Sequence, residues 1–182
     1  LENLYIFTNT EGTPENIRKF HPNIIVSSTG SAPLLPPIAG LKDRIDNENH
    51  NIYSILGMIS RINDFPKGLE GKKVVVVGGG AVGLDVVEFF ADRNADISIV
   101  EMMDQIGRDL DPVSKNDTKA MMKKHNVHQL TKTALLEVKD SSFLVKGDGE
   151  PYELPFEYGF VCLGMRAQGQ LFAELSDAFV SD

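Results

Sequence analysis

The feature that most constrains this chain is a run of four valines that leads directly into a glycine-rich turn. The valines lie in a predicted strand over residues 73–77, and the turn has the spacing G-x-G-x-x-G at Gly78, Gly80 and Gly83. An apolar, helix-forming sequence begins at residue 81. A buried strand, a tight turn and a helix N-terminus with free N–H groups together bind the pyrophosphate of a dinucleotide. The motif therefore predicts binding of NAD(H) or FAD; a glycine turn that binds nothing is the alternative.

An acidic residue stands where a ribose-binding carboxylate is expected. Glu101 ends the next predicted strand, about 20 residues beyond the glycine turn. A carboxylate at this place accepts hydrogen bonds from the ribose hydroxyls and repels a 2′-phosphate. Met102 and Met103 follow, and the next basic residue along the chain is Arg108. The sequence therefore favours NADH over NADPH, and a solvated strand end is the alternative for Glu101.

Composition excludes several classes of function. The chain has 182 residues, 42% hydrophobic and 24% charged, as is typical of a globular domain. Its formal net charge of -8 argues against nucleic acid or an anionic membrane as a partner. A single cysteine, Cys162, excludes an internal disulfide, a multi-cysteine metal site and a C-x-x-C redox pair. No apolar run approaches the roughly 20 residues of a membrane span and no signal-peptide pattern is present, so we expect a cytoplasmic location.

No constellation of catalytic side chains stands out. A G-x-S-x-G nucleophile elbow is absent, and the four histidines are too scattered for metal ligation. We therefore predict no catalytic residue and no metal site within this chain, because the cofactors carry the redox chemistry. Cys162 lies in an apolar run and is expected to be a buried, inert thiol. Glu88, on the helix after the glycine turn, is either a surface residue or faces the nicotinamide side of the pocket.

The order of elements predicts an α/β fold. Strands and helices alternate between residues 72 and 157, which indicates a Rossmann-like NAD(P)-binding domain with a parallel sheet and helices on both faces. The hairpin signal Gly147-Asp148-Gly149 adds an antiparallel three-strand ribbon. The predicted strands are 73–77, 96–101, 127–130, 133–139, 142–147, 152–154 and 158–163, and the predicted helices are 81–94 and 112–125.

The remaining sequence is less regular. The predicted elements there are strands over 4–9, 23–28 and 178–182 and helices over 14–20 and 54–61. Thr13 is the expected N-cap of the first helix, with Pro14 at its first position. Three prolines within five residues predict an extended linker over 33–40. Because the chain starts without methionine and both ends run into strand-like sequence, we expect a piece of a longer polypeptide.

Three segments match motifs of one known family. They are Ser28-Thr29-Gly30-Ser31-Ala32-Pro33 with Pro37-Ile38-Ala39-Gly40, the block from Val74 to Glu101, and Phe160-Val161-Cys162-Leu163-Gly164-Met165-Arg166. Together they resemble the pyridine nucleotide-disulphide oxidoreductase fold, in which an NAD(P)H-binding domain is inserted into an FAD-binding domain. The resemblance implies that residues 1–40 and 158–182 are remnants of the FAD-binding domain. It also implies that 41–71 is a connecting segment and that 72–157 is the NAD(H)-binding domain.

Two further segments are more particular, namely residues 9–15 and 101–110. They look like the C-terminal part of NADH:flavin oxidoreductases of the 2,4-dienoyl-CoA reductase and 2-enoate reductase type. In those proteins NADH reduces FAD, an iron–sulfur cluster relays the electrons, and FMN in an N-terminal TIM barrel reduces an activated C=C bond. The resemblance implies NAD(H) here and FAD in the intact enzyme. The FMN, the 4Fe-4S cluster and the barrel would belong to missing parts of the same polypeptide.

The chain also departs from the family pattern. The barrel, the cluster cysteines and the FAD glycine motif are absent, Ser28 precedes Thr-Gly where alanine is common, and Ala167-Gln168 replace the usual proline. We therefore expect this chain by itself to be inactive and to bind no FAD.

The resemblance also implies a set of cofactor-binding residues. The pyrophosphate contacts are Gly78, Gly79, Gly80, Ala81, Val82 and Gly83. Glu101 would hold the ribose, Met102 would lie beside the adenine, and Gly164 would pass near the nicotinamide. Thr29 and Gly30 would lie near FAD in the intact enzyme.

Several interpretations of function remain open on sequence alone. The leading one is the NADH-binding domain of a multi-cofactor flavin oxidoreductase. The alternatives are a stand-alone NAD(H)-binding module that senses redox state or regulates a partner, a Rossmann domain that holds FAD itself, and a disulfide reductase with its redox pair elsewhere. The sequence is compatible with an oligomer and does not identify the substrate.

Overall fold

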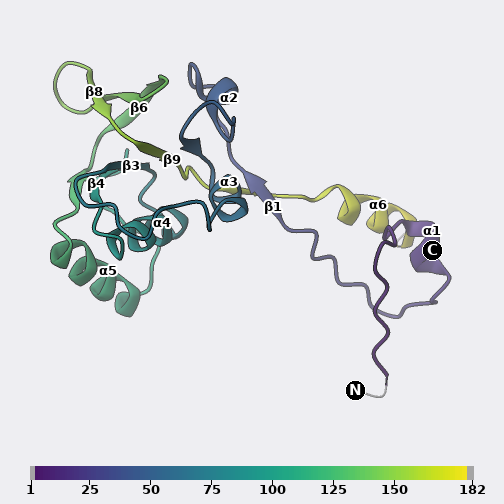
Figure 1. Ribbon diagram of the computed structural model, residues 1–182. Coiled ribbons are helices and arrows are strands. Elements are labelled where there is room, and N and C mark those ends of the chain that lie inside the picture. The colour runs from purple at the N-terminus through teal and green to yellow at the C-terminus, as the bar shows by residue number, and fades with distance from the viewer. Residues whose placement is uncertain (1–2, 180–182) are drawn as a thin grey trace. The chain divides into compact units, whose positions relative to one another are not determined.

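A computed structural model describes residues 3–179, which divide into two compact units. The central unit is Pro33–Met165, and the terminal unit combines the residues up to Ala32 with those from Arg166 onward. Two short strands, β1 (Ser31–Pro33) and β10 (Met165–Ala167), pair where the chain passes from one unit to the other. The colours of Figure 1 follow the chain through these elements. The predicted domain limits at residues 40, 71 and 157 stay predictions.

The central unit is built on a five-stranded sheet in the order β2-β9-β3-β4-β5, in which every neighbouring pair is parallel. The strands are β2 (Ile52–Tyr53), β3 (Lys73–Val77), β4 (Asp96–Val100), β5 (His128–Leu130) and β9 (Tyr158–Val161). The valines of β3 are all buried because this strand has neighbours on both edges and cover on both faces. The chain runs from β3 toward β4 on one side, while β9 lies on the other, so the sheet has a switch point between β3 and β9.

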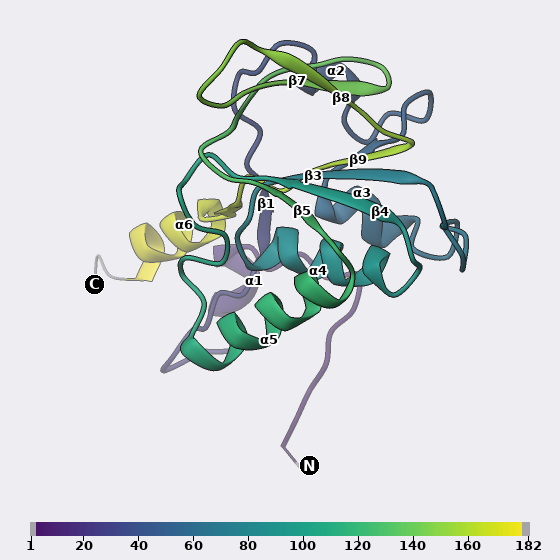
Figure 2. The same cartoon turned by 90° about the vertical axis from the view of Figure 1, so that its left-hand side faces the viewer.

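Helices cover one face of this sheet. Figure 2 shows α4 and α5 next to each other below the strands, with α3 on the same face. The helices are α3 (Ile55–Ser60), α4 (Ala81–Ala91) and α5 (Pro112–Lys124). Val74 and Val76 of β3 share a core with Val87 and Phe90 of α4. The apolar face of α4, which repeats every 3.6 residues, thus packs on the side of β3 that carries Val74 and Val76.

An antiparallel sheet covers the opposite face, whereas the sequence predicted helices on both faces. Its strands, in the order β6-β7-β8, are β6 (Ala134–Val138), β7 (Ser142–Lys146) and β8 (Tyr152–Pro155). Phe143 and Val145 of β7 pack with Val75 and Val77 of β3 in a second core, which lies above the parallel sheet in Figure 2. The prediction of helices on both faces is therefore wrong, because the ribbon itself has an apolar face that buries these valines. The predicted α/β class, with a parallel sheet and a three-strand ribbon, is confirmed.

Two short elements within the central unit were not predicted, and neither were β1, β10 and the helix α6 (Gln170–Phe179). The helix α2 (Leu41–Arg44) and the edge strand β2 lie in a polar stretch, where Leu41 and Ile52 are fully buried. Gly40 begins α2 with a φ of +74°, a conformation that favours glycine. Single apolar residues in a polar stretch produce no periodicity, so the sequence held no signal for these elements.

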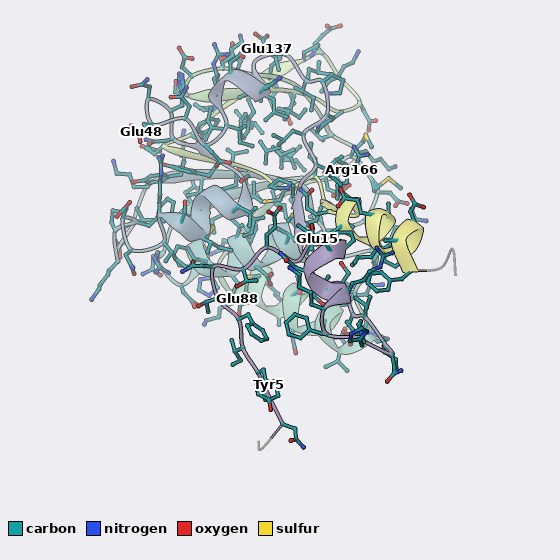
Figure 3. The ribbon with its side chains drawn as sticks, turned by 90° about the vertical axis from the view of Figure 1, so that its right-hand side faces the viewer. Tyr5, Glu15, Glu48, Glu88, Glu137 and Arg166 are labelled. Atoms are coloured by element: carbon teal, nitrogen blue, oxygen red, sulfur yellow. The ribbon has the colours of Figure 1, made fainter. Side chains whose placement is uncertain are left out.

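The terminal unit contains two helices. They are α1 (Pro14–Arg18) and α6 (Gln170–Phe179). The predicted cap of α1 is confirmed: the Thr13 hydroxyl accepts a hydrogen bond from the Asn16 N–H at 3.2 Å. The Arg18 guanidinium lies 5.2 Å from the centre of the Phe179 ring and joins the two helices, which lie together around Glu15 in Figure 3.

Two of the three strands predicted for the terminal unit are wrong, and the third lies mostly outside the described residues. Residues 4–9 and 23–28 have no regular secondary structure among the described residues. Phe179 belongs to α6, and 180–182 lie outside the described residues. A strand requires a neighbour that satisfies its N–H and C=O groups, and the described part of the terminal unit supplies none to these segments.

Candidate functional site

The glycine turn lies between β3 and α4, and close packing explains two of its glycines. Gly78 has a φ of +108°, and a Cβ there would lie 2.2 Å from the Cys162 carbonyl oxygen. A Cβ on Gly83 would lie 1.9 Å from the Gly78 carbonyl oxygen. The strand, the turn and the helix therefore approach one another too closely for any side chain at these two positions.

Gly80 has a different environment. It is the N-cap of α4, no side chain caps this helix, and no heavy atom lies within 4 Å of the place where a Cβ on Gly80 would be. The N–H groups of the first helical turn, at Ala81, Val82 and Gly83, have no intrahelical acceptor. The helix N-terminus also carries partial positive charge. Open space beside unsatisfied donors fits an anionic pyrophosphate.

Gly79 lies between Gly78 and Gly80, and both its N–H and its carbonyl oxygen are hydrogen-bonded within the protein. Its N–H donates to Glu101 Oε2 at 2.6 Å, and its carbonyl oxygen accepts from the Gly107 N–H at 2.7 Å. The N–H of Gly79 is therefore occupied by a protein acceptor, in contrast to the donors of the first turn of α4.

Glu101 stands directly after β4 and is partly buried. Its Oε1 accepts from the Met103 N–H at 2.7 Å, so each carboxylate oxygen holds one backbone donor. A carboxylate has about four acceptor positions, which leaves two for the hydroxyls of a ribose.

A cavity of about 590 Å³ opens at the carboxyl ends of the parallel strands of the central unit. Predicted site residues border it from three strands: Gly78, Gly80, Ala81 and Val82 after β3, Glu101 and Met102 after β4, and Gly164 after β9. In open α/β sheets, ligands bind at the carboxyl ends of strands beside a switch point. The volume lies within the range of small-molecule sites. The arrangement therefore fits a dinucleotide.

Several residues of the cavity were not predicted. Thr133 follows β5, the next parallel strand, and Ala134 and Leu135 begin β6. The carboxyl end of the predicted strand over 127–130 was the signal that pointed to this segment. Leu34 and Ile38 come from the proline-rich segment, which had no signal in the sequence. Its place depends on tertiary hydrogen bonds, such as the one from the Leu34 N–H to the Gly164 carbonyl oxygen at 2.9 Å.

Cys162 borders the cavity but is not a nucleophile. The prediction that this thiol is buried is confirmed. Burial and, to a smaller extent, the charge of Asp85 together raise the pKa of the Cys162 thiol to about 12. The side chain is therefore a neutral thiol at physiological pH and does not act as a thiolate nucleophile.

Other candidate residues are not among those that line the cavity. Thr29 and Gly30 belong to the terminal unit, where the Thr29 hydroxyl donates to the Gln168 carbonyl oxygen at 2.6 Å. Their role at FAD stays a prediction. Glu88, labelled in Figure 3, is exposed and borders a separate groove between α4 and α5 with Asp85 and Asp117. The structure therefore favours the surface alternative for Glu88.

Residues 3–179 contain no candidate metal cluster and no candidate membrane-spanning helix. No group of three or more His, Cys, Asp or Glu side chains in this part of the chain is placed to hold a metal ion. Likewise, none of the helices described here has the length and apolar character that crossing a membrane requires.

Comparison with known proteins gives consistent results. The chain is similar to a metal reductase from Desulforamulus reducens, 26% identical over 202 residues, which cover 92% of this chain and 28% of the relative. It is similar to an NADH oxidase from Thermoanaerobacter brockii, 30% identical over 124 residues, which cover 68% of this chain and 18% of the relative. A solved structure of 2-naphthoyl-CoA reductase has the same fold, with a TM-score of 0.75, 22% identity, and coverage of 93% of this chain and 24% of that chain.

The chain thus spans less than a third of the length of these proteins. A family model described as pyridine nucleotide-disulphide oxidoreductase matches residues 6–179. Because this match covers almost the whole chain and the fold agrees with it, the resemblance seen in the sequence is confirmed, and the chain belongs to the pyridine nucleotide-disulphide oxidoreductase family.

Proposed function

We propose that the central unit binds NADH and that the chain is the NADH-binding part of a flavin-dependent oxidoreductase. One observation carries the proposal: the free N–H groups of α4 and the carboxylate of Glu101 border the same cavity at the switch point of the sheet. The first arrangement attracts a pyrophosphate, and the second attracts a ribose diol. Their combination is what a dinucleotide requires.

The cavity suggests how each part of NADH is held. Gly80, Ala81 and Val82, whose backbone leaves both space and donors, would hold the pyrophosphate. Glu101 would hold the adenosine ribose and Met102 would contact the adenine, while Gly164, after β9, would lie near the nicotinamide. When bound, NADH would supply a hydride to the flavin. Apolar residues such as Leu34, Leu135 and Leu163 line the cavity and keep water from the hydride donor.

Charge supports NADH rather than NADPH. Glu101 places an anion where the 2′-phosphate of NADPH would lie, and Met102 and Met103, which follow it, carry no charge. An anionic phosphate near a partly buried carboxylate is unfavourable unless a cation separates them. We therefore expect a clear preference for NADH.

Exposed apolar side chains in the terminal unit support the proposal that the chain is part of a larger flavoprotein. Apolar side chains of its irregular segments are strongly exposed, among them Tyr5 at 79%, Ile24 at 82% and Val26 at 81%, and Tyr5 stands on such a segment in Figure 3. Contiguous exposed apolar residues mark surfaces that other segments cover. We propose that an FAD-binding domain completed outside this chain covers them and that Thr29 and Gly30 lie near its FAD. This favours the larger flavoprotein over a stand-alone sensing module.

For the intact enzyme, we propose that electrons pass from FAD to FMN through an iron–sulfur cluster and reduce an activated C=C bond of the enoate or dienoyl type. The support is the resemblance of residues 9–15 and 101–110 to enzymes of that type. The 2-naphthoyl-CoA reductase with the same fold is named for reduction of an acyl-CoA, as is 2,4-dienoyl-CoA reductase. The cluster and FMN would be held by parts outside this chain.

The test is a calorimetric titration of the 182-residue chain with NADH and, separately, with NADPH. Binding of NADH with a clear preference over NADPH is the expected result. A folded chain that binds neither dinucleotide, or binds both equally, contradicts the proposal. The polypeptide that contains this chain, assayed with NADH and an enoate, tests the substrate class independently.

A further inference from the structure

The Glu101 carboxylate makes two hydrogen bonds that a ribose-binding role does not require. Oε2 accepts from the Gly79 N–H at 2.6 Å, and Oε1 accepts from the Met103 N–H at 2.7 Å. Both bonds join a charged acceptor to a backbone donor, which makes them stronger than neutral hydrogen bonds. The two donors belong to different segments, the glycine turn and the residues after β4. The carboxylate therefore ties these segments together before any ligand arrives.

The donor on the glycine turn is itself held firmly. The Gly79 carbonyl oxygen accepts from the Gly107 N–H at 2.7 Å. A Cβ on Gly79 would lie 3.0 Å from Glu101 Oε2 and 3.1 Å from Ile106 Cγ1, which is tighter than nearly all real Cβ contacts. Glu101, Ile106 and Gly107 thus hold the Gly79 peptide from both sides. The absence of a side chain at Gly79 is what lets the carboxylate approach this closely.

A carboxylate fixed in this way differs from a free one in two respects. Its side chain has already lost rotamer freedom, so binding of a ribose does not have to order it. It is also tied to the turn on one side and to Met103 on the other, so it cannot rotate away from a 2′-phosphate without breaking two charge-assisted hydrogen bonds. The fixed position of the Glu101 carboxylate therefore favours binding of a ribose diol and disfavours binding of a ribose that carries a 2′-phosphate.

We propose that Gly79 and Met103 hold the Glu101 carboxylate in place and that this fixed position, in addition to its charge, sets the discrimination between NAD(H) and NADP(H). Gly79 is accordingly a positioning residue that acts through Glu101. The inference rests on the NADH binding proposed above and names the part of that site that selects the cofactor.

The experiment compares two alanine substitutions in the same turn. Gly79→Ala keeps the charge of Glu101 but displaces its carboxylate, because the new Cβ meets Oε2. Gly80→Ala is the matched control: its Cβ enters open space where the pyrophosphate would lie and makes no contact with Glu101. Calorimetric titrations measure the affinity of each variant for NADH and for NADPH.

The two variants should lose affinity in different ways. We expect Gly79→Ala to reduce the NADH-to-NADPH affinity ratio about threefold to tenfold, the effect of weakening one charge-assisted hydrogen bond. Gly80→Ala should weaken both dinucleotides in parallel and leave the ratio unchanged, because both carry the same pyrophosphate. A Gly79→Ala chain that is folded by circular dichroism and keeps the wild-type ratio overturns the inference.

A second measurement tests the anchoring without any ligand. In ¹H–¹⁵N spectra of the free chain, Glu101→Ala should shift the amide resonances of both Gly79 and Met103, because each amide loses its charged acceptor. The control Glu88→Ala should shift neither resonance. An unchanged resonance of either amide in Glu101→Ala overturns the inference even if NADH binds. Conversely, if both resonances shift but the wild-type chain binds no NADH, the proposed function is refuted and the anchoring stands.

Discussion

The carbonyl oxygen of Cys162 lies 2.2 Å from the point where a Cβ on Gly78 would sit. The end of β9 and the turn after β3 therefore touch backbone to backbone, and β9 forms one side of the switch point. The same turn contacts the helix, since a Cβ on Gly83 would lie 1.9 Å from the Gly78 carbonyl oxygen. Two glycines thus maintain the fold, whereas Gly80, beside them, faces open space.

Gly83→Ala should destabilise the chain. The added methyl group meets the Gly78 carbonyl oxygen, and overpacking of this kind costs about 1–3 kcal/mol. Urea denaturation should show a lower midpoint with an unchanged m-value. Gly80→Ala is the control, with a loss below about 1 kcal/mol because only the N-cap preference changes. Equal losses in the two variants would contradict the close packing of Gly83.

Gly80→Val should separate binding from folding. The extended backbone of Gly80, with φ −78° and ψ −179°, accommodates valine, but its side chain fills the space proposed for the pyrophosphate. The affinity for NADH should fall at least about tenfold, or 1.4 kcal/mol. Thermal unfolding without ligand should shift little, which distinguishes a blocked site from a damaged fold. Normal NADH binding by this variant would show that the turn does not hold the pyrophosphate.

Glu101→Ala should weaken NADH more than NADPH. Removal of the carboxylate takes away the acceptor for the ribose hydroxyls, and a hydrogen bond to a charged group contributes about 1.5–3 kcal/mol, which corresponds to roughly tenfold or more in affinity. The gap between the two dinucleotides should narrow, because NADPH also escapes the charge repulsion. Calorimetry measures both affinities. Glu88 is an exposed carboxylate outside the cavity, so Glu88→Ala is the control and should change neither affinity. If Glu101→Ala leaves the preference for NADH over NADPH unchanged, Glu101 does not have the proposed role at the ribose.

The Cys162 thiol should make the chain less stable at high pH. Its pKa is raised from 9.0 to about 12 in the folded chain, so the folded state keeps the proton after the unfolded state has lost it. Stability from this group is fully present below about pH 9 and declines toward pH 12, by at most roughly 1.4 kcal/mol per pH unit. Urea midpoints of the wild type and Cys162→Ala across this range isolate the effect from other titrating groups. Parallel pH profiles for the two chains would contradict the raised pKa.

The sequence predicted the central unit well because local and tertiary preferences agree there. The β3 run and the helix after it are both strongly apolar, and the structure places β3 over Lys73–Val77 and α4 from Ala81. Asp111-Pro112 signals the start of α5, and the Asp111 carboxylate accepts from the Val113 N–H at 2.9 Å. These signals are local, so a single sequence contains them in full.

Prediction failed where a contact partner decides the structure. Residues 4–9 and 23–28 have strand-like composition, but composition supplies no neighbour for their hydrogen bonds, and the described chain leaves them irregular. Helices were predicted on both faces of the parallel sheet, but β6, β7 and β8 cover one of them, because an apolar ribbon and an apolar helix bury the same valines equally well. Patterning alone cannot choose between such partners.

The sequence by itself determined that the chain contains a dinucleotide-type glycine turn followed by an acidic residue, since both depend on the order of residue types along one βαβ unit. Only the tertiary structure decided what closes the cavity, because Leu34, Thr133 and Leu163 come from three separate segments. It also decided that Gly79 contacts Glu101 while Gly80 faces open space, although both glycines belong to one turn. The physical reason is that a motif fixes the local path of the backbone, whereas side chains from distant strands fix what each amide and each Cβ position meets.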